Sequence, residues 1–171
     1  MTVIETARLV LRRFTEDDAP FVFSLLNDPD WLRFIGNKDV HDLEASRRYI
    51  RNGPMVMYER FGFGLYLTAL NSDSTPIGMC GLIRREDVDD VDIGFALLPQ
   101  FCGQGYAREA AAATLDYGWN KVGLKRIVAF TSTDNVRSGR LLETIGLRFE
   151  REVTVPDSAE RLWLYAAERG I

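Results

Sequence analysis

The sequence predicts a mixed α/β fold, in which helices cover both faces of one central, mostly antiparallel sheet. Segments with the two-residue alternation of strands and segments with the three- and four-residue spacing of amphipathic helices follow one another without a linker, a repeat or a low-complexity stretch. The chain has 171 residues, of which 46% are hydrophobic, and this supports one sizeable core. We therefore expect a single domain over residues 1–171.

The first part of the chain predicts one strand and two helices. Residues 8–14 alternate apolar and charged side chains, as half-buried strands do. A helix-start signature at 15–18 introduces a helix over 17–26, which the Asn-Asp-Pro-Asp sequence at 27–30 breaks. A second helix is expected over 43–52.

The middle of the chain predicts three strands. Residues 63–70 and 77–84 are rich in aromatic and branched side chains, and the Asn-Ser-Asp-Ser-Thr-Pro sequence at 71–76 between them predicts a hairpin turn. A further strand over 92–98 follows the acidic turn 86–90, and a glycine-rich loop comes directly after it.

The last part predicts a helix, a buried strand, a second helix and two closing strands. Asp134 and Asn135 can cap the second helix, and Gly146 suits its left-handed end. A turn over 156–160 separates the closing strands. The other ranges expected here are 106–118 for the first helix, 126–131 for the buried strand, and 147–155 and 161–167 for the closing strands.

Composition excludes several classes of partner. Lys and Arg number 21 against 25 Asp and Glu, a net charge of -4, so no broad cationic surface is present for a nucleic acid. The two cysteines form no Cys-x-x-Cys pair and the single histidine has no cluster around it, which argues against a disulfide scaffold or a metal site. The N-terminus lacks a leader pattern and no apolar run is long enough for a membrane, so a soluble cytoplasmic protein is expected.

The glycine-rich loop is the main functional signal. Gln100, Gly103 and Gly105 lie between a strand and a long helix, where main-chain N–H groups converge at the positive end of the helix and can bind a diphosphate. It is neither a Walker loop nor a dinucleotide fingerprint, since position 106 is Tyr and position 108 is Arg. A tight strand-to-helix turn without a ligand explains the loop alone equally well.

A wider set of motifs resembles the GNAT superfamily of N-acetyltransferases, and within it the RimJ/RimL-like branch. Gln100-x-x-Gly103-x-Gly105 fits the superfamily signature that follows the fourth strand. The branch-like motifs cover nearly the whole chain in the expected order; they are Thr6-Ala-Arg-Leu-Val-Leu-Arg12, Asp92-Ile-Gly-Phe-Ala-Leu, Gly103-Gln-Gly-Tyr-Ala-Arg-Glu-Ala110, Asn135-x-x-Ser138 and Leu141-Leu-Glu-Thr-Ile-Gly146.

The resemblance implies acetyl-CoA as co-substrate and no metal. Its diphosphate would meet the main-chain amides of the loop, including those of Gln104, Tyr106 and Ala107. Its pantetheine would run along Phe95, Ala96 and Leu97, where the family's sheet splays at the fourth strand. An amide near Phe95 or Ala96 could then polarise the thioester carbonyl. Gly94 fits this reading, because glycine in the middle of a strand often marks a bulge.

Aminolysis of a thioester needs a neutral amine, and therefore a proton acceptor. Asp92 stands where several GNAT enzymes place a strand-four glutamate, so the resemblance makes it the candidate base, acting through a water. A solvent-facing strand end is the alternative reading of Asp92, and Asp89 and Asp90 compete for the role.

The departing thiolate needs a proton or a hydrogen bond. Many GNAT enzymes use a tyrosine seven residues after the asparagine, but here that position is Leu142. By resemblance to the RimJ/RimL-like branch, Ser138 would donate the proton and Asn135 would bind the pantetheine. From the residues alone, Asn135 is a helix cap and Ser138 a small residue on a packed face.

The acceptor is expected to be a primary amine, either a protein N-terminal α-amine or a small molecule. Trp31 and Phe34 fall in the segment where the superfamily builds its acceptor pocket, although core packing explains such aromatics as well. Cys102 is expected to occupy space in the loop on the ligand side and not to act as a nucleophile. Direct attack of the amine in a ternary complex is therefore expected. A monomer or a homodimer is expected, and the alternative function is a non-catalytic or regulatory acyl-CoA-binding protein of the same fold.

Overall fold

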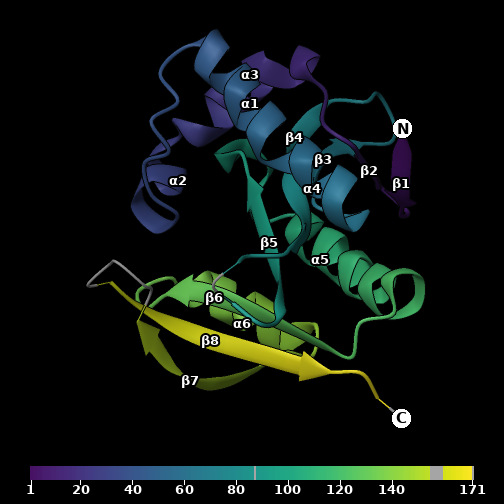
Figure 1. Cartoon of the computed structure of the whole chain (residues 1–171), viewed down its shortest axis with the longest axis vertical. Helices are drawn as coiled ribbons and strands as arrows, with labels where there is room; N and C mark the ends of the chain where they lie inside the picture. Colours follow the sequence, from purple (N-terminus) through teal and green to yellow (C-terminus); the bar gives the residue numbers. More distant parts are fainter. Residues whose placement is uncertain (87, 155–159, 171) are drawn as a thin grey trace.

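A computed structural model describes residues 1–86, 88–154 and 160–170. One eight-stranded sheet runs through the described residues in the order β1-β2-β3-β4-β5-β6-β8-β7 (Figure 1). Its strands are β1 (Thr2–Glu5), β2 (Leu9–Arg12), β3 (Leu65–Leu70), β4 (Pro76–Ile83), β5 (Val91–Leu97), β6 (Arg126–Ser132), β7 (Arg148–Thr154) and β8 (Arg161–Glu168). Within this sheet all neighbouring strands are antiparallel except β5 and β6, which are parallel.

Helices lie on both faces of the sheet, as the sequence predicts. They are α1 (Ala19–Leu26), α2 (Pro29–Phe34), α3 (Leu43–Asn52), α4 (Pro54–Phe61), α5 (Tyr106–Tyr117) and α6 (Val136–Thr144). In Figure 1, α1 to α4 gather at the end of the molecule opposite to β7 and β8. In the described residues, none of the helices combines the length and the apolarity that crossing a membrane requires.

Two hydrophobic clusters fill the two faces. One packs Ala111 and Leu115 of α5 against strand residues such as Leu82, and the other packs α1 and α3 against residues such as Met79. Successive side chains of a strand point to opposite faces, so the central strands β3 and β4 contribute to both clusters. The near-continuous burial of β4 follows from this position.

Three elements were missed by the sequence reasoning: β1, α2 and α4. The strand β1 has only four residues and pairs with β2 alone, so its alternation is too short to be distinctive. The helices α2 and α4 begin with Pro29 and Pro54 immediately after the segments that end α1 and α3. Proline suits the first turn of a helix, where its missing N–H costs no hydrogen bond, so a breaker of one helix starts the next.

Other expectations need small corrections. The strand expected at 8–14 is shorter, and the strand expected as the fourth is the fifth because β1 precedes it. The pairing of β5 with β4 is continuous from Asp92 to Leu97, so Gly94 marks no bulge against β4. Most of the turn expected at 156–160 lies outside the described residues.

Candidate active site

The strands β5 and β6 separate after two residues of pairing. Val91 pairs with Ile127 and Asp92 with Val128, and no later residue of β5 pairs with β6 among the described strands. On its other side β5 stays paired with β4 as far as Leu97. Residues 93–97 therefore have one edge without a strand partner, which we call the free edge of β5. The splay that the resemblance implies is present.

The register shows which main-chain groups face the free edge. The amide of Leu98 donates to the carbonyl of Ile77 at 2.8 Å, so residues 92, 94, 96 and 98 direct their main-chain groups towards β4. The alternate residues Ile93, Phe95 and Leu97 direct theirs away from β4, along the free edge. Of the two amides considered for the thioester carbonyl, that of Phe95 has the suitable direction and that of Ala96 does not.

The glycine-rich loop lies at the end of β5 and leads into α5. Gly103 and Gly105 have φ values of +79° and +84°, a region that side chains disfavour. The first main-chain bond of the helix runs from the amide of Glu109 to the carbonyl of Gly105 at 3.1 Å. For the amides of residues 103–108, no acceptor is found in the described part of the chain. Unpartnered amides at a helix start form a group of donors suited to an anion.

The helix α6 begins beside the other diverging strand. Asn135 follows β6 and caps α6, its side-chain Oδ1 accepting from the amide of Ser138 at 3.3 Å. The cap reading of Asn135 is thus correct, and it leaves the Nδ2 group of the same side chain available as a donor. Ser138 is half-buried, and no partner for its hydroxyl is found within the described chain. Both residues lie near the end of β6, where it diverges from β5.

Asp92 occupies the point where β5 and β6 separate, and it is buried. Only 3% of the residue is exposed, so the reading of a solvent-facing strand end is wrong. Its Oδ2 accepts from Arg85 Nε at 3.1 Å, while Oδ1 is buried with no partner in the described chain. Burial raises the pKa of Asp92 to about 6, against the charge and hydrogen bond of Arg85, which lower it.

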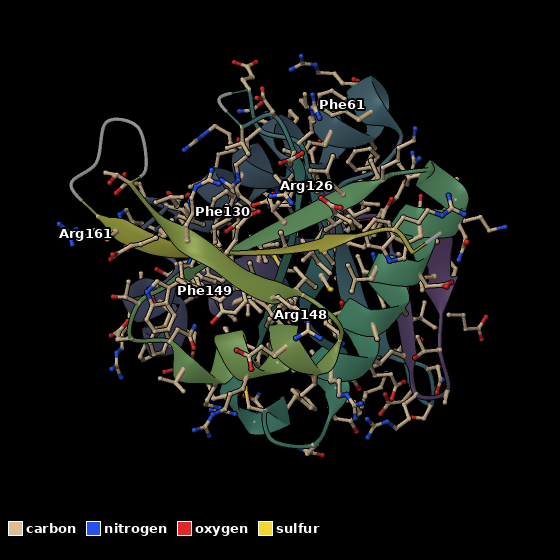
Figure 2. The ribbon with its side chains drawn as sticks, turned by 90° about the horizontal axis from the view of Figure 1, so that it is seen from below. Phe61, Arg126, Phe130, Arg148, Phe149 and Arg161 are labelled. Carbon is tan, nitrogen blue, oxygen red and sulfur yellow. The ribbon has the colours of Figure 1, made fainter. Side chains whose placement is uncertain are left out.

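The competing carboxylates differ from Asp92 in environment. Asp90 accepts from Arg126 Nε at 3.1 Å, and the same guanidinium contacts Glu150 at 2.6 Å and Glu168 at 3.5 Å. Figure 2 labels Arg126 in this part of the sheet. Asp89 is exposed, and its main-chain carbonyl accepts from Arg84. Neither carboxylate combines burial with an unpartnered oxygen as Asp92 does.

The aromatic residues expected at the acceptor pocket lie on α2. Trp31 is 6% exposed within the second hydrophobic cluster, and its indole Nε1 is buried with no partner in the described chain. Phe34 is half-buried, and the guanidinium Cζ of Arg33 lies 4.6 Å from the centroid of its ring. Arg33 also contacts Asp134 at 3.5 Å, so α2 reaches the loop between β6 and α6.

Other side chains are unsuited to the chemistry. Leu142 is 1% exposed and packs in the core, so no tyrosine-like donor stands at that position. Burial raises the pKa of the Cys102 thiol, and burial raises that of Cys80 to about 12, which disfavours the thiolate that a nucleophile requires. Over the described ranges, no group of three or more His, Cys, Asp or Glu side chains is arranged to hold a metal ion.

Comparisons with known proteins agree with this geometry. Residues 8–148 match the family model of the acetyltransferase (GNAT) domain. The chain belongs to the GNAT acetyltransferase family. The uncharacterized N-acetyltransferase YoaA of Bacillus subtilis is 28% identical over 150 residues, which are 86% of this chain and 84% of that protein. This GNAT chain is accordingly an acetyl-CoA-dependent acyltransferase of the N-acetyltransferase type.

Solved structures share the fold over the full length. A GNAT-family acetyltransferase from Bacillus anthracis superposes with a TM-score of 0.81 at 27% identity, covering 98% of both chains. RimL, a ribosomal L7/L12 α-N-protein acetyltransferase solved with coenzyme A, has a TM-score of 0.77 at 18% identity, again covering 98% of both chains. The fold of the RimJ/RimL-like branch is therefore the fold of this GNAT chain.

The sequence reasoning missed two charged side chains near the site. The hairpin between β4 and β5 pairs Ile83 with Asp92, so Arg85, two residues beyond Ile83, can contact the carboxylate. The opposite charges of Arg85 and Asp92, on either side of the acidic turn expected at 86–90, were the available signal. Arg8 contacts Glu109 across 101 residues of sequence, and no local pattern predicts such a pair.

Proposed function

We propose that this GNAT chain transfers an acetyl group from acetyl-CoA to a primary amine by direct attack, with both substrates bound at once. One observation carries the proposal: the free edge of β5 is flanked by the loop of unpartnered amides at its end and by the buried Asp92 at its start. An acyl donor with a diphosphate, an amide-containing arm and a thioester would place these parts, in this order, at the loop amides, along the free edge of β5 and near Asp92.

The main chain would hold the donor. The amides of Gly103, Gln104, Gly105, Tyr106 and Ala107 would bind the diphosphate, with Gln100 supporting the loop, since its carbonyl accepts from Gln104 Nε2 at 3.1 Å. The pantetheine would lie along Phe95, Ala96 and Leu97, and the Nδ2 group of Asn135 would bind it from the side of α6. The Phe95 amide would stabilise the negative charge that develops on the thioester oxygen.

Asp92 would accept the proton of the amine, directly or through a water. A carboxylate with a pKa of about 6 is mostly ionised at neutral pH and is more basic than an ordinary aspartate. Its unpartnered Oδ1 offers an acceptor for a proton. An α-amine, with a pKa of ~8, has a larger neutral fraction than a lysine side chain, with a pKa of ~10.4, so this base suits an α-amine better.

Ser138 would donate the proton that the CoA thiolate takes up, because its hydroxyl has no other partner among the described residues and lies one turn into α6. Trp31 and Phe34 would line the acceptor side. The raised pKa of Cys102 supports direct attack over an acetyl-cysteine intermediate.

The test is CoA release measured with acetyl-CoA and a panel of amines: peptides with a free α-amine, peptides with only a lysine amine, and small amines. Turnover with one class and none without an amine supports the proposal. Binding of acetyl-CoA without turnover by any amine would favour the non-catalytic acyl-CoA-binding protein, for which the leucine at position 142 argues. Absence of CoA binding would overturn both functions.

A further inference from the structure

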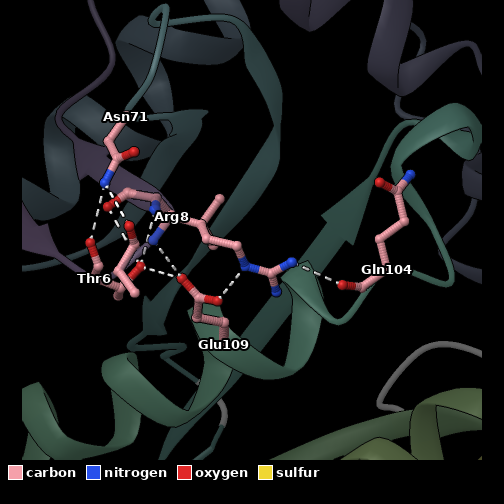
Figure 3. Close-up of polar contacts among 7 residues, drawn as sticks. Thr6, Arg8, Asn71, Gln104 and Glu109 are labelled. Atoms are coloured by element: carbon pink, nitrogen blue, oxygen red, sulfur yellow. Dashed lines mark hydrogen bonds and ion pairs between the residues drawn. The ribbon is translucent and has the colours of Figure 1, made fainter.

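The loop between β1 and β2 lies against the first turn of α5 (Figure 3). The carboxylate of Glu109 accepts three hydrogen bonds from this loop: from the hydroxyl of Thr6, from the main-chain amide of Arg8 at 2.9 Å and from Arg8 Nε at 2.7 Å. The pKa of Glu109 is lowered, because these hydrogen bonds outweigh a burial effect that would raise it. The carboxylate is thus held ionised against the loop.

The guanidinium of Arg8 continues from Glu109 onto the glycine-rich loop. Its Nη1 donates to the carbonyl of Gln104 at 3.0 Å, and its Cζ stands 4.3 Å from the ring centroid of Tyr106. A Cβ added at Gly105 would come within 3.2 Å of its Nη2. One side chain therefore contacts Gln104 and Tyr106, and it would crowd any side chain at Gly105 between them, within the segment whose amides have no partner in the described chain.

The loop that carries Arg8 is itself fixed to the sheet. Asn71 Nδ2 donates to the main-chain carbonyls of Thr6 at 3.2 Å and Ala7 at 3.0 Å, and the amide of Asn71 donates to the carbonyl of Arg8 at 2.9 Å. Asn71 directly follows β3, a central strand. The contacts of Arg8 thus connect the glycine-rich loop, through Asn71, to the central sheet.

We propose that Arg8 and Glu109 form a positioning pair that holds the glycine-rich loop in the conformation that binds the diphosphate of the acyl donor. The inference rests on the proposed function of this loop. Within the described chain, the only other side-chain hydrogen bond on the carbonyl or amide groups of residues 100–105 is that of Gln104 to Gln100. This loop has two left-handed glycines and few hydrogen bonds of its own. If it had to become ordered on binding, the affinity for the donor would be lower.

Substitutions of Arg8 and Glu109 can distinguish a positioning role from simple attraction between the Arg8 charge and the phosphates. If Arg8 acted only as a free cation for phosphates, removing the negative charge of Glu109 would strengthen donor binding or leave it unchanged. If the pair positions the loop, Glu109→Gln must weaken binding as Arg8→Ala does. Arg8→Lys retains the charge but not the planar fork that contacts Glu109 and Gln104 together, so it should rescue little.

The experiment measures the Kd of CoA by calorimetry for wild type, Arg8→Ala, Glu109→Gln and the double variant. Each single change should raise Kd about three- to tenfold, and the double variant should be no weaker than the worse single variant. Arg51→Ala is the matched control, since Arg51 contacts Glu16 at 2.7 Å with 47% exposure, against 2.7 Å and 44% for Arg8. It should leave Kd within about twofold of wild type.

A truncated donor supplies the readout that a general structural defect would not give. S-acetyl-pantetheine lacks the diphosphate, so Arg8→Ala and Glu109→Gln should reduce kcat/KM with acetyl-CoA and leave it unchanged with this donor.

An equal loss with both donors, or a Glu109→Gln variant that binds CoA as wild type does, would overturn the inference. If Arg8→Ala fails to fold, Thr6→Val removes one bond to Glu109 and must raise Kd in the same direction. A wild-type chain that binds no CoA would instead refute the proposed function.

Discussion

Asp92 and Val128 form the last pair between β5 and β6, and beyond them the two strands diverge. The carboxylate thus stands at the vertex of the divergence, 3% exposed and with one oxygen unpartnered in the described chain. Its position follows from the strand pairing, whereas its basicity follows from burial. Both properties give measurable consequences.

Turnover should depend on the ionisation of Asp92. In wild type, kcat/KM should rise with pH through about 6, the pKa to which burial raises this carboxyl, because only the ionised form accepts a proton. Asp92→Asn should lower turnover by about 10²-fold or more and lose this limb of the profile. Rates measured from pH 5 to 9 with a fixed amine test this, and an unchanged limb in the variant would assign the titration to another group.

The same residue should affect stability with the opposite sign to an ordinary ion-paired carboxylate. The folded pKa of about 6 exceeds the ordinary 3.8, so stability from this group is fully present below about 3.8 and is lost as pH rises through about 6. The loss is on the order of 3 kcal/mol, the free energy that corresponds to raising the pKa from 3.8 to about 6. Asp92→Asn lacks this dependence, so the difference in unfolding free energy between the two proteins should change across this window. A constant difference would contradict the raised pKa.

Ser138→Ala should reduce kcat roughly ten- to hundredfold, at the low end of general-acid contributions, because a thiolate is a good leaving group. The Kd of acetyl-CoA should change little, since the amide of Ser138, not its hydroxyl, makes the capping bond. Ser24→Ala is a control on α1, where the hydroxyl donates to the carbonyl of Pro20. Wild-type turnover in Ser138→Ala would remove this residue from the mechanism.

Gly105→Ala should weaken CoA binding beyond its effect on stability. The φ of +84° costs an alanine ~1–2 kcal/mol, and the added Cβ would lie 3.2 Å from Arg8 Nη2. Gly123 has the same φ of +84° with nothing within 4 Å of an added Cβ, so Gly123→Ala isolates the backbone strain. Both variants should unfold at lower temperature, but only Gly105→Ala should raise the Kd of CoA. Equal Kd values would show that the loop does not bind the donor.

Much of the fold could be predicted because local pattern and tertiary role agree. The Asn-Ser-Asp-Ser-Thr-Pro turn predicts the hairpin of β3 and β4, and Asn135 and Gly146 mark the ends of α6. The two helices that were missed, α2 and α4, each begin at a proline that also ends the preceding helical segment. Pro29 and Pro54 each follow a helix and begin another, and a linear reading records only the break.

The candidate site could be predicted in part. The loop residues and the splay came from motifs, and they depend on main-chain geometry that glycine and strand order specify. The burial of Asp92 could not be predicted, because it depends on packing around a hairpin that also carries Arg85. The pair of Arg8 and Glu109 depends on contact between segments far apart in the sequence, which no periodicity encodes.

The free edge of β5 has a consequence for how the site can change over time. Its donor-facing groups are peptide N–H and C=O groups, which every residue except proline carries in full. Substitutions at Phe95 or Leu97 can therefore alter the fit of the thioester without removing the hydrogen-bonding pattern that the pantetheine would meet. Phe95→Pro is the single exchange at its position that deletes the donor itself. If the pantetheine binds along this edge as proposed, substitutions there would preserve its main-chain hydrogen bonds, whereas the proposed acceptor side, with side chains such as Trp31, would change with each substitution.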